Sequence, residues 1–210
     1  MGKRKSGKTG KLQSRAATEH TMRIVGGRLR GRKLQYHGDP QTRPMKERVR
    51  EAIFNLLGPA AKGKYAIDLF AGTGAIGLEA ISRGAIGGTF IERHFPTARL
   101  IKRNAEHLGC SEICQVVAAN TFLWIEENVA QLSREPWAVF CSPPYDLFCD
   151  READLVHLMR TLKDAAPPHS AFIVESDKRF DIHDRMPFAT WDVRTYAPAV
   201  VAIADNESSG

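Results

Sequence analysis

The sequence predicts an α/β protein with a Rossmann-like fold, in which helices cover both faces of a doubly wound, mostly parallel sheet. Short apolar segments alternate with helical patterns, and the apolar segments lie at 65–70, 88–93, 113–118, 138–141 and 171–176. Such alternation is typical of parallel sheets, because each crossover between parallel strands needs a long connection, usually a helix. The first apolar segment leads into a glycine-rich loop and a helix, which is typical of nucleotide-binding α/β proteins.

The amino-terminal part of the chain is strongly basic. Up to Gly38 it contains 11 Lys or Arg and one acid, whereas the rest of the chain contains 19 basic and 23 acidic residues. Residues 1–21 are rich in Gly, Ser and Lys, which predicts a disordered basic tail. A basic arm on a mildly acidic body suits a protein that meets a phosphate backbone on one side, although a merely solvated tail would have the same composition.

Residues 22–41 are predicted to form a small twisted hairpin, because apolar residues are interrupted there by three glycines. The main α/β domain is expected at 42–204 and a short tail at 205–210. Within the domain, apolar residues at helical spacing predict a helix that starts at Lys46 and ends before Gly58.

The later elements follow the same alternation. Helices are predicted at 95–108, 122–132 and 155–162. Beyond them, the alternating pattern up to Val201 predicts a C-terminal antiparallel hairpin.

The loop after the first apolar segment has the spacing of a cofactor site. Asp68 lies near the end of that segment, and Gly72, Gly74 and Gly77 match the fingerprint in which glycines let the backbone approach a cofactor. Glu92 lies near the end of the next segment, where a carboxylate can bind ribose hydroxyls. The loop alone fits NAD and S-adenosylmethionine equally, so a dehydrogenase and a methyltransferase are both open.

The turn Ser142-Pro143-Pro144-Tyr145 follows another apolar segment. The amine of a nucleobase can be methylated once its lone pair leaves ring conjugation, which requires acceptors for its N–H bonds and a surface for stacking. Ser142 Oγ and the Pro143 carbonyl can be those acceptors, the prolines restrict the backbone, and Tyr145 offers a ring. An ordinary proline turn that closes a strand is the alternative. In combination with the glycine loop and Glu92, the turn favours a methyl donor over a hydride carrier.

Six segments resemble those of one known family. They are RIVGGRLRGRKL from Arg23, TRPMKERVREAIFNLL from Thr42, DLFAGTGAIGLEAISR from Asp68, FIER from Phe90, CSPPY from Cys141 and FIVES from Phe172. The family they resemble is that of the RsmD-type methyltransferases, class I enzymes that use S-adenosylmethionine to methylate the N2 amine of a guanine in 16S rRNA. The first two segments are the most specific, because very many methyltransferases share the glycine loop.

The resemblance implies a role for each group of residues. The implied catalytic residues are Ser142, Pro143, Pro144 and Tyr145. The implied cofactor-binding residues are Thr42, Arg43, Pro44, Asp68, Phe70, Ala71, Gly72, Thr73, Gly74, Glu92, Arg93 and Asn120. The implied RNA-binding residues are Arg23, Arg28, Arg30, Arg32 and Lys33. At Asn120, contact with the adenine ring and a helix N-cap are equal alternatives.

The implied partner is 16S rRNA, either free or in a partly assembled small ribosomal subunit. We expect a cytoplasmic protein, because no apolar stretch is long enough to span a membrane and the basic start is followed by no apolar signal core. We expect a monomer, because nothing in the sequence demands more than one chain. The four cysteines lack C-x-x-C spacing and the histidines show no metal-binding spacing, so reduced thiols and no metal site are expected.

One residue of the proline turn departs from the family pattern. Ser142 stands where the family usually has an acidic residue. A neutral hydrogen bond in place of a charge-assisted one costs about 1 kcal/mol, near tenfold in rate, so Ser142 predicts a slower enzyme. Two alternatives stay open: methylation of another amine, such as adenine N6 in RNA or DNA, and a catalytically weakened RNA-binding paralogue.

Overall fold

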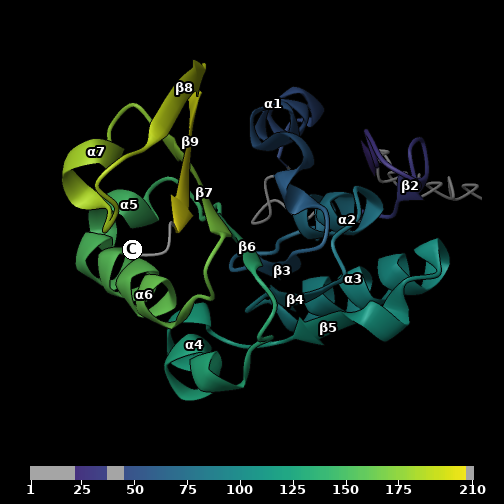
Figure 1. The fold of residues 1–210 in the computed structure, drawn as a ribbon. Helices are drawn as coiled ribbons and strands as arrows, with labels where there is room; N and C mark the ends of the chain where they lie inside the picture. Colours follow the sequence, from purple (N-terminus) through teal and green to yellow (C-terminus); the bar gives the residue numbers. More distant parts are fainter. Residues whose placement is uncertain (1–21, 37–44, 207–210) are drawn as a thin grey trace, which may run out of the picture.

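The computed structural model describes residues 22–36 and 45–206. In this part of the chain, seven strands form one sheet in the order β5-β4-β3-β6-β7-β9-β8 (Figure 1). The strands are β3 (Tyr65–Asp68), β4 (Gly87–Ile91), β5 (Cys114–Val117), β6 (Trp137–Cys141), β7 (Ser170–Asp177), β8 (Asp192–Tyr196) and β9 (Ala199–Asn206). The expectations for residues 1–21, for Thr42, Arg43 and Pro44, and for 207–210 lie outside the described residues.

The strand order places the site. Strands β3 to β7 are mutually parallel, and β8 and β9 add an antiparallel hairpin beside β7, which confirms the predicted α/β fold class. From β3 the chain moves outward to β4 and β5, and it then returns to place β6 on the other side of β3. Ligands of open α/β sheets bind outside the carboxyl ends of the strands where the order reverses in this way. We therefore expect the site beyond Asp68 and Cys141.

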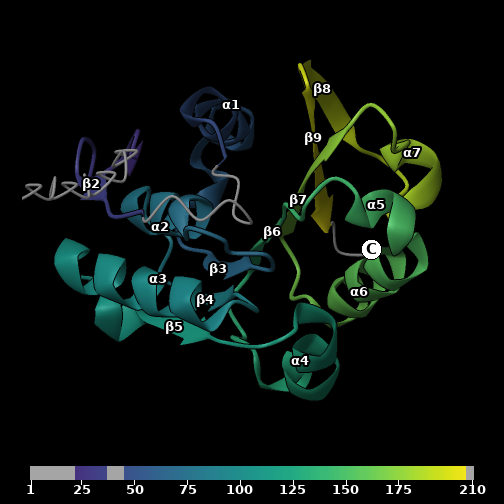
Figure 2. The same cartoon turned by 180° about the vertical axis from the view of Figure 1, so that it is seen from behind.

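Helices cover both faces of the sheet (Figures 1 and 2). One face carries α1 (Glu47–Leu57), α2 (Ala75–Ser82) and α3 (Phe95–Leu108), and the other carries α4 (Thr121–Asn128), α6 (Glu152–Ala165) and α7 (Ile182–Arg185). Successive residues of a strand point to opposite faces. Accordingly, Ala66 belongs to the buried cluster under the first three helices, and Ile67 belongs to the cluster under the others.

Several boundaries differ from the predicted ones. The predicted helix 122–132 ends as an α-helix at Asn128 and continues as the 3-10 helix η3 (Val129–Gln131), while α6 begins at Glu152 instead of Leu155. The short helices α5 (Leu147–Asp150) and α7 were not predicted, because a single turn is too short to show helical periodicity. The other 3-10 helices are η1 (Gly58–Ala61) and η2 (Ser111–Ile113). No helix of the described residues is long and apolar enough to cross a membrane.

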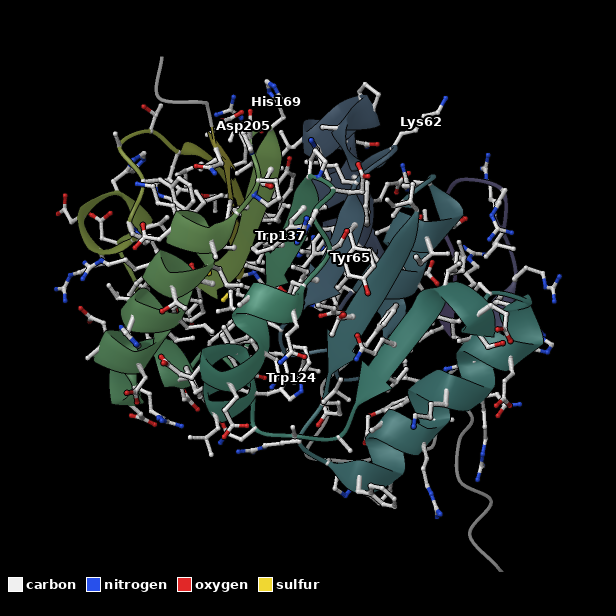
Figure 3. The ribbon with its side chains drawn as sticks, turned by 60° about the horizontal axis from the view of Figure 1, so that its bottom comes forward. Lys62, Tyr65, Trp124, Trp137, His169 and Asp205 are labelled. Carbon is white, nitrogen blue, oxygen red and sulfur yellow. The ribbon has the colours of Figure 1, made fainter. Side chains whose placement is uncertain are left out.

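Side-chain and backbone contacts join the amino ends of β3, β6 and β7. Tyr65 and Trp137 are register partners at the start of β3 and β6, where Figure 3 shows them close together. The backbone N–H of Trp137 donates to Ser170 Oγ over 2.8 Å, and its indole N–H donates to the Ser133 carbonyl over 2.7 Å. A cavity of about 500 Å³ lies at the opposite, carboxyl end of the sheet.

The amino-terminal hairpin is held on α2 by one buried carboxylate. Its strands β1 (Met22–Arg23) and β2 (Lys33–Leu34) pair antiparallel. Glu79 of α2 accepts hydrogen bonds from the backbone N–H groups of Val25 and Gly26 over 2.7 and 2.6 Å. The same carboxylate contacts Arg50 Nε at 3.4 Å and Arg83 Nε at 2.9 Å. The hairpin, α1 and α2 are therefore joined at a single fully buried group.

The hairpin backbone lies so close to the end of α2 that Gly27 has no room for a side chain. Gly27 has a φ of +73°, and a Cβ atom there would lie 2.1 Å from the Ser82 carbonyl oxygen. Ser82 Oγ in turn accepts from the Leu29 N–H over 2.9 Å and donates to the Gly26 carbonyl over 2.6 Å. The hairpin thus lies directly on the end of α2.

Candidate active site

A cavity of about 500 Å³ opens at the carboxyl ends of the parallel strands. It brings together most of the residues that the sequence predicted for the site. Those that line it are Phe70, Ala71, Gly72, Thr73, Glu92, Arg93, Asn120, Ser142, Pro143, Pro144 and Tyr145. The cavity residues Met45, Lys46, Val49, Pro198 and Ala199 come from the start of α1 and from the β8–β9 turn.

The loop after β3 is held by the carboxylate that follows β4. Glu92 Oε2 accepts from the Gly72 N–H over 2.8 Å, and Oε1 accepts from the His94 N–H over 2.7 Å. Gly74 caps α2 with a φ of +75°, and a Cβ atom there would lie 2.9 Å from Ile101 Cγ2. Glu92 thus fixes the glycine loop and also faces the cavity.

Asp68 lies behind this loop. It is fully buried, its Oδ2 accepts from the Gly77 N–H over 3.2 Å, and its Oδ1 has no partner among the described residues. Burial, with a smaller contribution from the charge of Glu92, raises the pKa of Asp68 to about 7, although the bond from Gly77 opposes this. Asp68 and Gly74 are the two described residues of the predicted cofactor set that do not line the cavity. Direct contact of Asp68 with a cofactor stays a prediction.

An aromatic wall lies beside Asn120. The side chain of Asn120 accepts from the Phe122 N–H over 3.0 Å, which confirms the N-cap of α4, and the adenine contact stays a prediction. Phe122 meets Phe70 edge to face at a centroid distance of 5.8 Å. The Arg151 guanidinium lies 4.2 Å from the centroid of the Phe122 ring. This wall offers flat apolar surface to a planar ring.

The proline turn is held by a carboxylate to which the sequence analysis assigned no role. Ser142 Oγ donates a hydrogen bond to Glu175 Oε2, and the Tyr145 hydroxyl donates to Glu175 Oε1 over 2.7 Å. Glu175 lies on β7, is 7% exposed and lines the cavity. The signal that could have found it is strand register: Cys141 of β6 pairs with Val174 of β7, so the next residues on both strands are neighbours.

The far rim of the cavity is built from two further elements. Arg48 of α1 donates to the Ala197 carbonyl in the β8–β9 turn, which links α1 to this turn. Arg179 Nη1 lies 2.9 Å from Asp146 Oδ1, and its Nη2 lies 2.9 Å from Asp177 Oδ2. At this rim, the charge of Arg179 is therefore offset by two carboxylates.

The predicted RNA-binding residues lie apart from the cavity, on the hairpin. Arg23, Arg28, Arg30, Arg32 and Lys33 are all exposed. Arg23 Nε contacts Glu47 Oε2 at 3.3 Å, and Arg32 Nη2 donates to the His107 carbonyl over 2.8 Å. Their exposure suits contact with phosphates, and their role stays a prediction.

Comparison with known proteins gives consistent relatives. The family described as "Conserved hypothetical protein 95" matches residues 22–204. Ribosomal RNA small subunit methyltransferase D of Escherichia coli (strain K12) is 39% identical over 124 residues, which cover 59% of this chain and 60% of the relative. The protein of the same name from Haemophilus influenzae is 32% identical over 159 residues, which cover 75% of this chain and 79% of the relative. The match therefore spans about three fifths of the length of the E. coli relative.

Solved structures share the fold. That of yhhF from Escherichia coli has a TM-score of 0.70 and 29% identity, and it covers 90% of this chain and 99% of its own. The 16S rRNA methyltransferase RsmC of Thermus thermophilus, solved with AdoMet and guanosine, has a TM-score of 0.66 over 89% of this chain and 50% of its own, and its 17% identity shows the fold alone. By the extent of the family match and of its relatives, the chain belongs to the Conserved hypothetical protein 95 family, that of the RsmD-type methyltransferases.

Proposed function

We propose that the chain is an S-adenosylmethionine-dependent methyltransferase that modifies the exocyclic N2 amine of a guanine in 16S rRNA. The observation that carries this proposal is the bonding of Ser142 and Tyr145 to Glu175, at the same cavity as the glycine loop and Glu92. The names of the relatives, rRNA small subunit methyltransferases, support rRNA as the substrate. As an RNA-modifying protein of this family, it would act in the cytoplasm, and a monomer suffices because one chain supplies the whole cavity.

The residues present fit the cofactor. The cavity volume of about 500 Å³ is in the range of small-molecule sites, and the unpartnered Asp68 Oδ1 is a buried acceptor beside the glycine loop. Glu92 would hold the ribose, because each carboxylate oxygen can accept a further hydrogen bond in addition to that from Gly72 or His94. When bound, S-adenosylmethionine supplies a methyl group activated by its sulfonium.

The adenine ring and the methionine end of the cofactor would be placed by other residues of the site. Asn120 and Phe122 would meet the adenine ring. Asp68 would orient the methionine end by fixing the start of α2 through its bond from Gly77.

The proline turn would hold the target amine. Because Ser142 donates its own proton to Glu175, the lone pairs of Oγ are available to accept an N–H bond from the guanine. The charge of Glu175 polarises this hydroxyl, so the bond to the amine is stronger than one to an isolated serine. The pair of Ser142 and Glu175 would thus stand in for the acidic residue that the family usually has at position 142.

Tyr145 and Pro143 complete the arrangement. The Tyr145 hydroxyl donates to Glu175 over 2.7 Å, and this bond holds the ring in place. The ring would then stack on the extruded base. The Pro143 carbonyl would accept the second N–H bond. After methyl transfer, the amine releases one proton to Ser142 Oγ while the serine proton passes to Glu175. Positioning of the base against an activated donor supplies much of the rate, so a stronger base is not required.

The RNA itself must give up one base to the cavity. Extrusion of a nucleotide costs a few kcal/mol, which contacts elsewhere on the RNA must offset. The exposed arginines of the hairpin, Arg28, Arg30 and Arg32, would provide such contacts through phosphates, independent of sequence.

The test is the identity of the methylated nucleoside. Methyl-labelled S-adenosylmethionine is incubated with unmodified 16S rRNA, both free and in small ribosomal subunits, and the RNA is digested for mass spectrometry. We expect N2-methylguanosine, and the Tyr145→Ala variant should bind the cofactor but form much less product. A methylated adenine would retain the mechanism and change the substrate. Cofactor binding without transfer to either form of RNA would indicate a catalytically weakened paralogue and contradict the proposal.

A further inference from the structure

The outer face of α3 is strongly basic. The helix packs on the sheet through Ala98, Ile101 and Ala105, among other buried residues. Its exposed face carries Arg99, Lys102 and Arg103, and Arg99 lies three and four residues before the other two, so it neighbours both on the helix surface. We call these three residues the α3 track.

The α3 track makes no ion pairs within the part of the chain that the structure describes. Among the described residues, none of the three forms an ion pair with a carboxylate, and Glu106 is the single acid of α3. The helix of equal length on the opposite face, α6, contains three acids and two basic residues. Like charges three and four residues apart destabilise a helix, and a partner of opposite charge would remove this repulsion.

The C-terminal half of α3 contacts the hairpin. Arg32 of the hairpin donates to the His107 carbonyl at the last turn of α3 over 2.8 Å. Asn104 of α3 accepts from the Gln35 N–H over 2.9 Å and donates to the Gln35 carbonyl over 3.1 Å. In both views, the hairpin and α3 lie on the same side of the molecule (Figures 1 and 2). The hairpin arginines and the α3 track are therefore held in a fixed relation.

The start of α3 lies next to the cavity. Arg93 and His94 line the cavity and directly precede Phe95, the first residue of α3. Phe95 is 57% exposed, and the Arg99 guanidinium lies 4.8 Å from the centroid of its ring. The helix of 14 residues is about 21 Å long, so it bridges the distance from the cavity to the hairpin.

We infer that the α3 track binds the backbone of the RNA strand between the hairpin and the cavity, with Phe95 as a stacking surface for a base near the target nucleotide. Arginine binds phosphate in a bidentate manner, and an exposed aromatic ring beside a cation is typical of surfaces that bind single-stranded nucleic acid. An acidic protein segment would use the charges but would not require the exposed ring. The inference rests on the proposed function, because it takes RNA as the substrate.

A pair of matched variants tests this inference in the full chain. Arg103→Glu on α3 and Arg160→Glu on α6 both replace an exposed arginine within a helix of 14 residues, and both lower the net charge by the same amount. Binding of unmodified 16S rRNA is measured over a series of salt concentrations. We expect Arg103→Glu to weaken binding about tenfold and to reduce the slope of log affinity against log salt by about one, because a phosphate contact is lost. Arg160→Glu should bind within about twofold of the wild type, since no phosphate contact is expected there.

The controls separate the outcomes. Thermal melting and S-adenosylmethionine affinity should be the same for both variants, because neither residue lines the cavity. Equal RNA binding by Arg103→Glu and Arg160→Glu, in a protein whose wild type methylates rRNA, would overturn the α3 track and leave the proposed function intact. Loss of polyglutamate binding with unchanged RNA binding would assign the face to an acidic protein and also overturn it. A wild type that neither binds nor methylates rRNA would overturn both proposals.

Discussion

Glu79 and Glu175 are both buried carboxylates, and their surroundings differ in kind. Glu79 is surrounded by the fold: two backbone N–H groups of the hairpin and the guanidinium groups of Arg50 and Arg83 take up its oxygens. Glu175 receives two side-chain hydroxyls, from Ser142 and Tyr145, and faces the cavity. A carboxylate held by cations and backbone N–H groups anchors structure, whereas one that accepts from the hydroxyls of a cavity turn is placed to influence chemistry there.

Among the predictions, the largest effect should come from Glu79, and it is a loss of stability. Glu79→Gln removes the buried ion-pair partner of Arg50, which is itself fully buried, so the free energy of unfolding should fall by about 3–5 kcal/mol. Chemical denaturation measures this loss. Glu106→Gln, on the exposed face of α3, is the control and should change stability by less than about 0.5 kcal/mol. A similar small change in Glu79→Gln would show that the buried network does not hold the hairpin.

Asp68 is a third buried carboxylate and sharpens the comparison, because one of its oxygens has no partner among the described residues. The pKa of Asp68 is raised from the ordinary value of 3.8 to about 7 in the folded protein. At pH values between these two, the Asp68 carboxyl is therefore protonated in the folded state and ionised in the unfolded state. Its contribution to stability is complete below about pH 4 and is lost as the pH rises to about 7, by up to about 4 kcal/mol.

Denaturation of the wild type and of Asp68→Asn at pH 5 and pH 8 measures this contribution. The asparagine variant cannot lose a proton at this position, so its stability should fall less between the two pH values than that of the wild type. Parallel curves for the two proteins would contradict the raised pKa.

The smallest effect should come from removal of the Tyr145 hydroxyl, and it is a loss of turnover. Tyr145→Phe keeps the ring and removes only the donor to Glu175, so turnover should fall by about twofold to tenfold. Affinity for S-adenosylmethionine, measured by calorimetry, should not change. A fall as large as that of Tyr145→Ala would mean that the hydroxyl, and not the stacking surface, is the main contribution of this residue.

The sequence predicted the fold and most of the cavity for a physical reason. Strand, helix and glycine patterns are local, and residues that follow parallel strands meet at one end of the sheet whatever the details of packing. Ser142, which follows one predicted strand, and Glu92, near the end of another, both line the cavity, while their roles stay predictions. Asp68, the last residue of β3, lies behind the loop instead, because it is buried and accepts a hydrogen bond from Gly77 of α2.

The two carboxylates of the comparison could not be predicted in the same way. The role of Glu175 depends on the register between β6 and β7, which the sequence does not specify locally. Glu79 is an acid on a helix, which usually faces solvent, and it is buried because the hairpin, 53 or 54 residues earlier in the chain, packs over it. Both residues act through contacts that are distant in sequence.

The central claim is that Glu175 serves the chemistry of the proline turn, and single-turnover methyl transfer to 16S rRNA with Glu175→Gln tests it most directly. The loss of a charged acceptor behind Ser142 predicts a rate that is lower by about tenfold or more, with unchanged melting and unchanged affinity for S-adenosylmethionine. Addition of Ser142→Asp to this variant should restore part of the rate, because it returns an acidic acceptor to the turn. A wild-type rate in Glu175→Gln would contradict the claim.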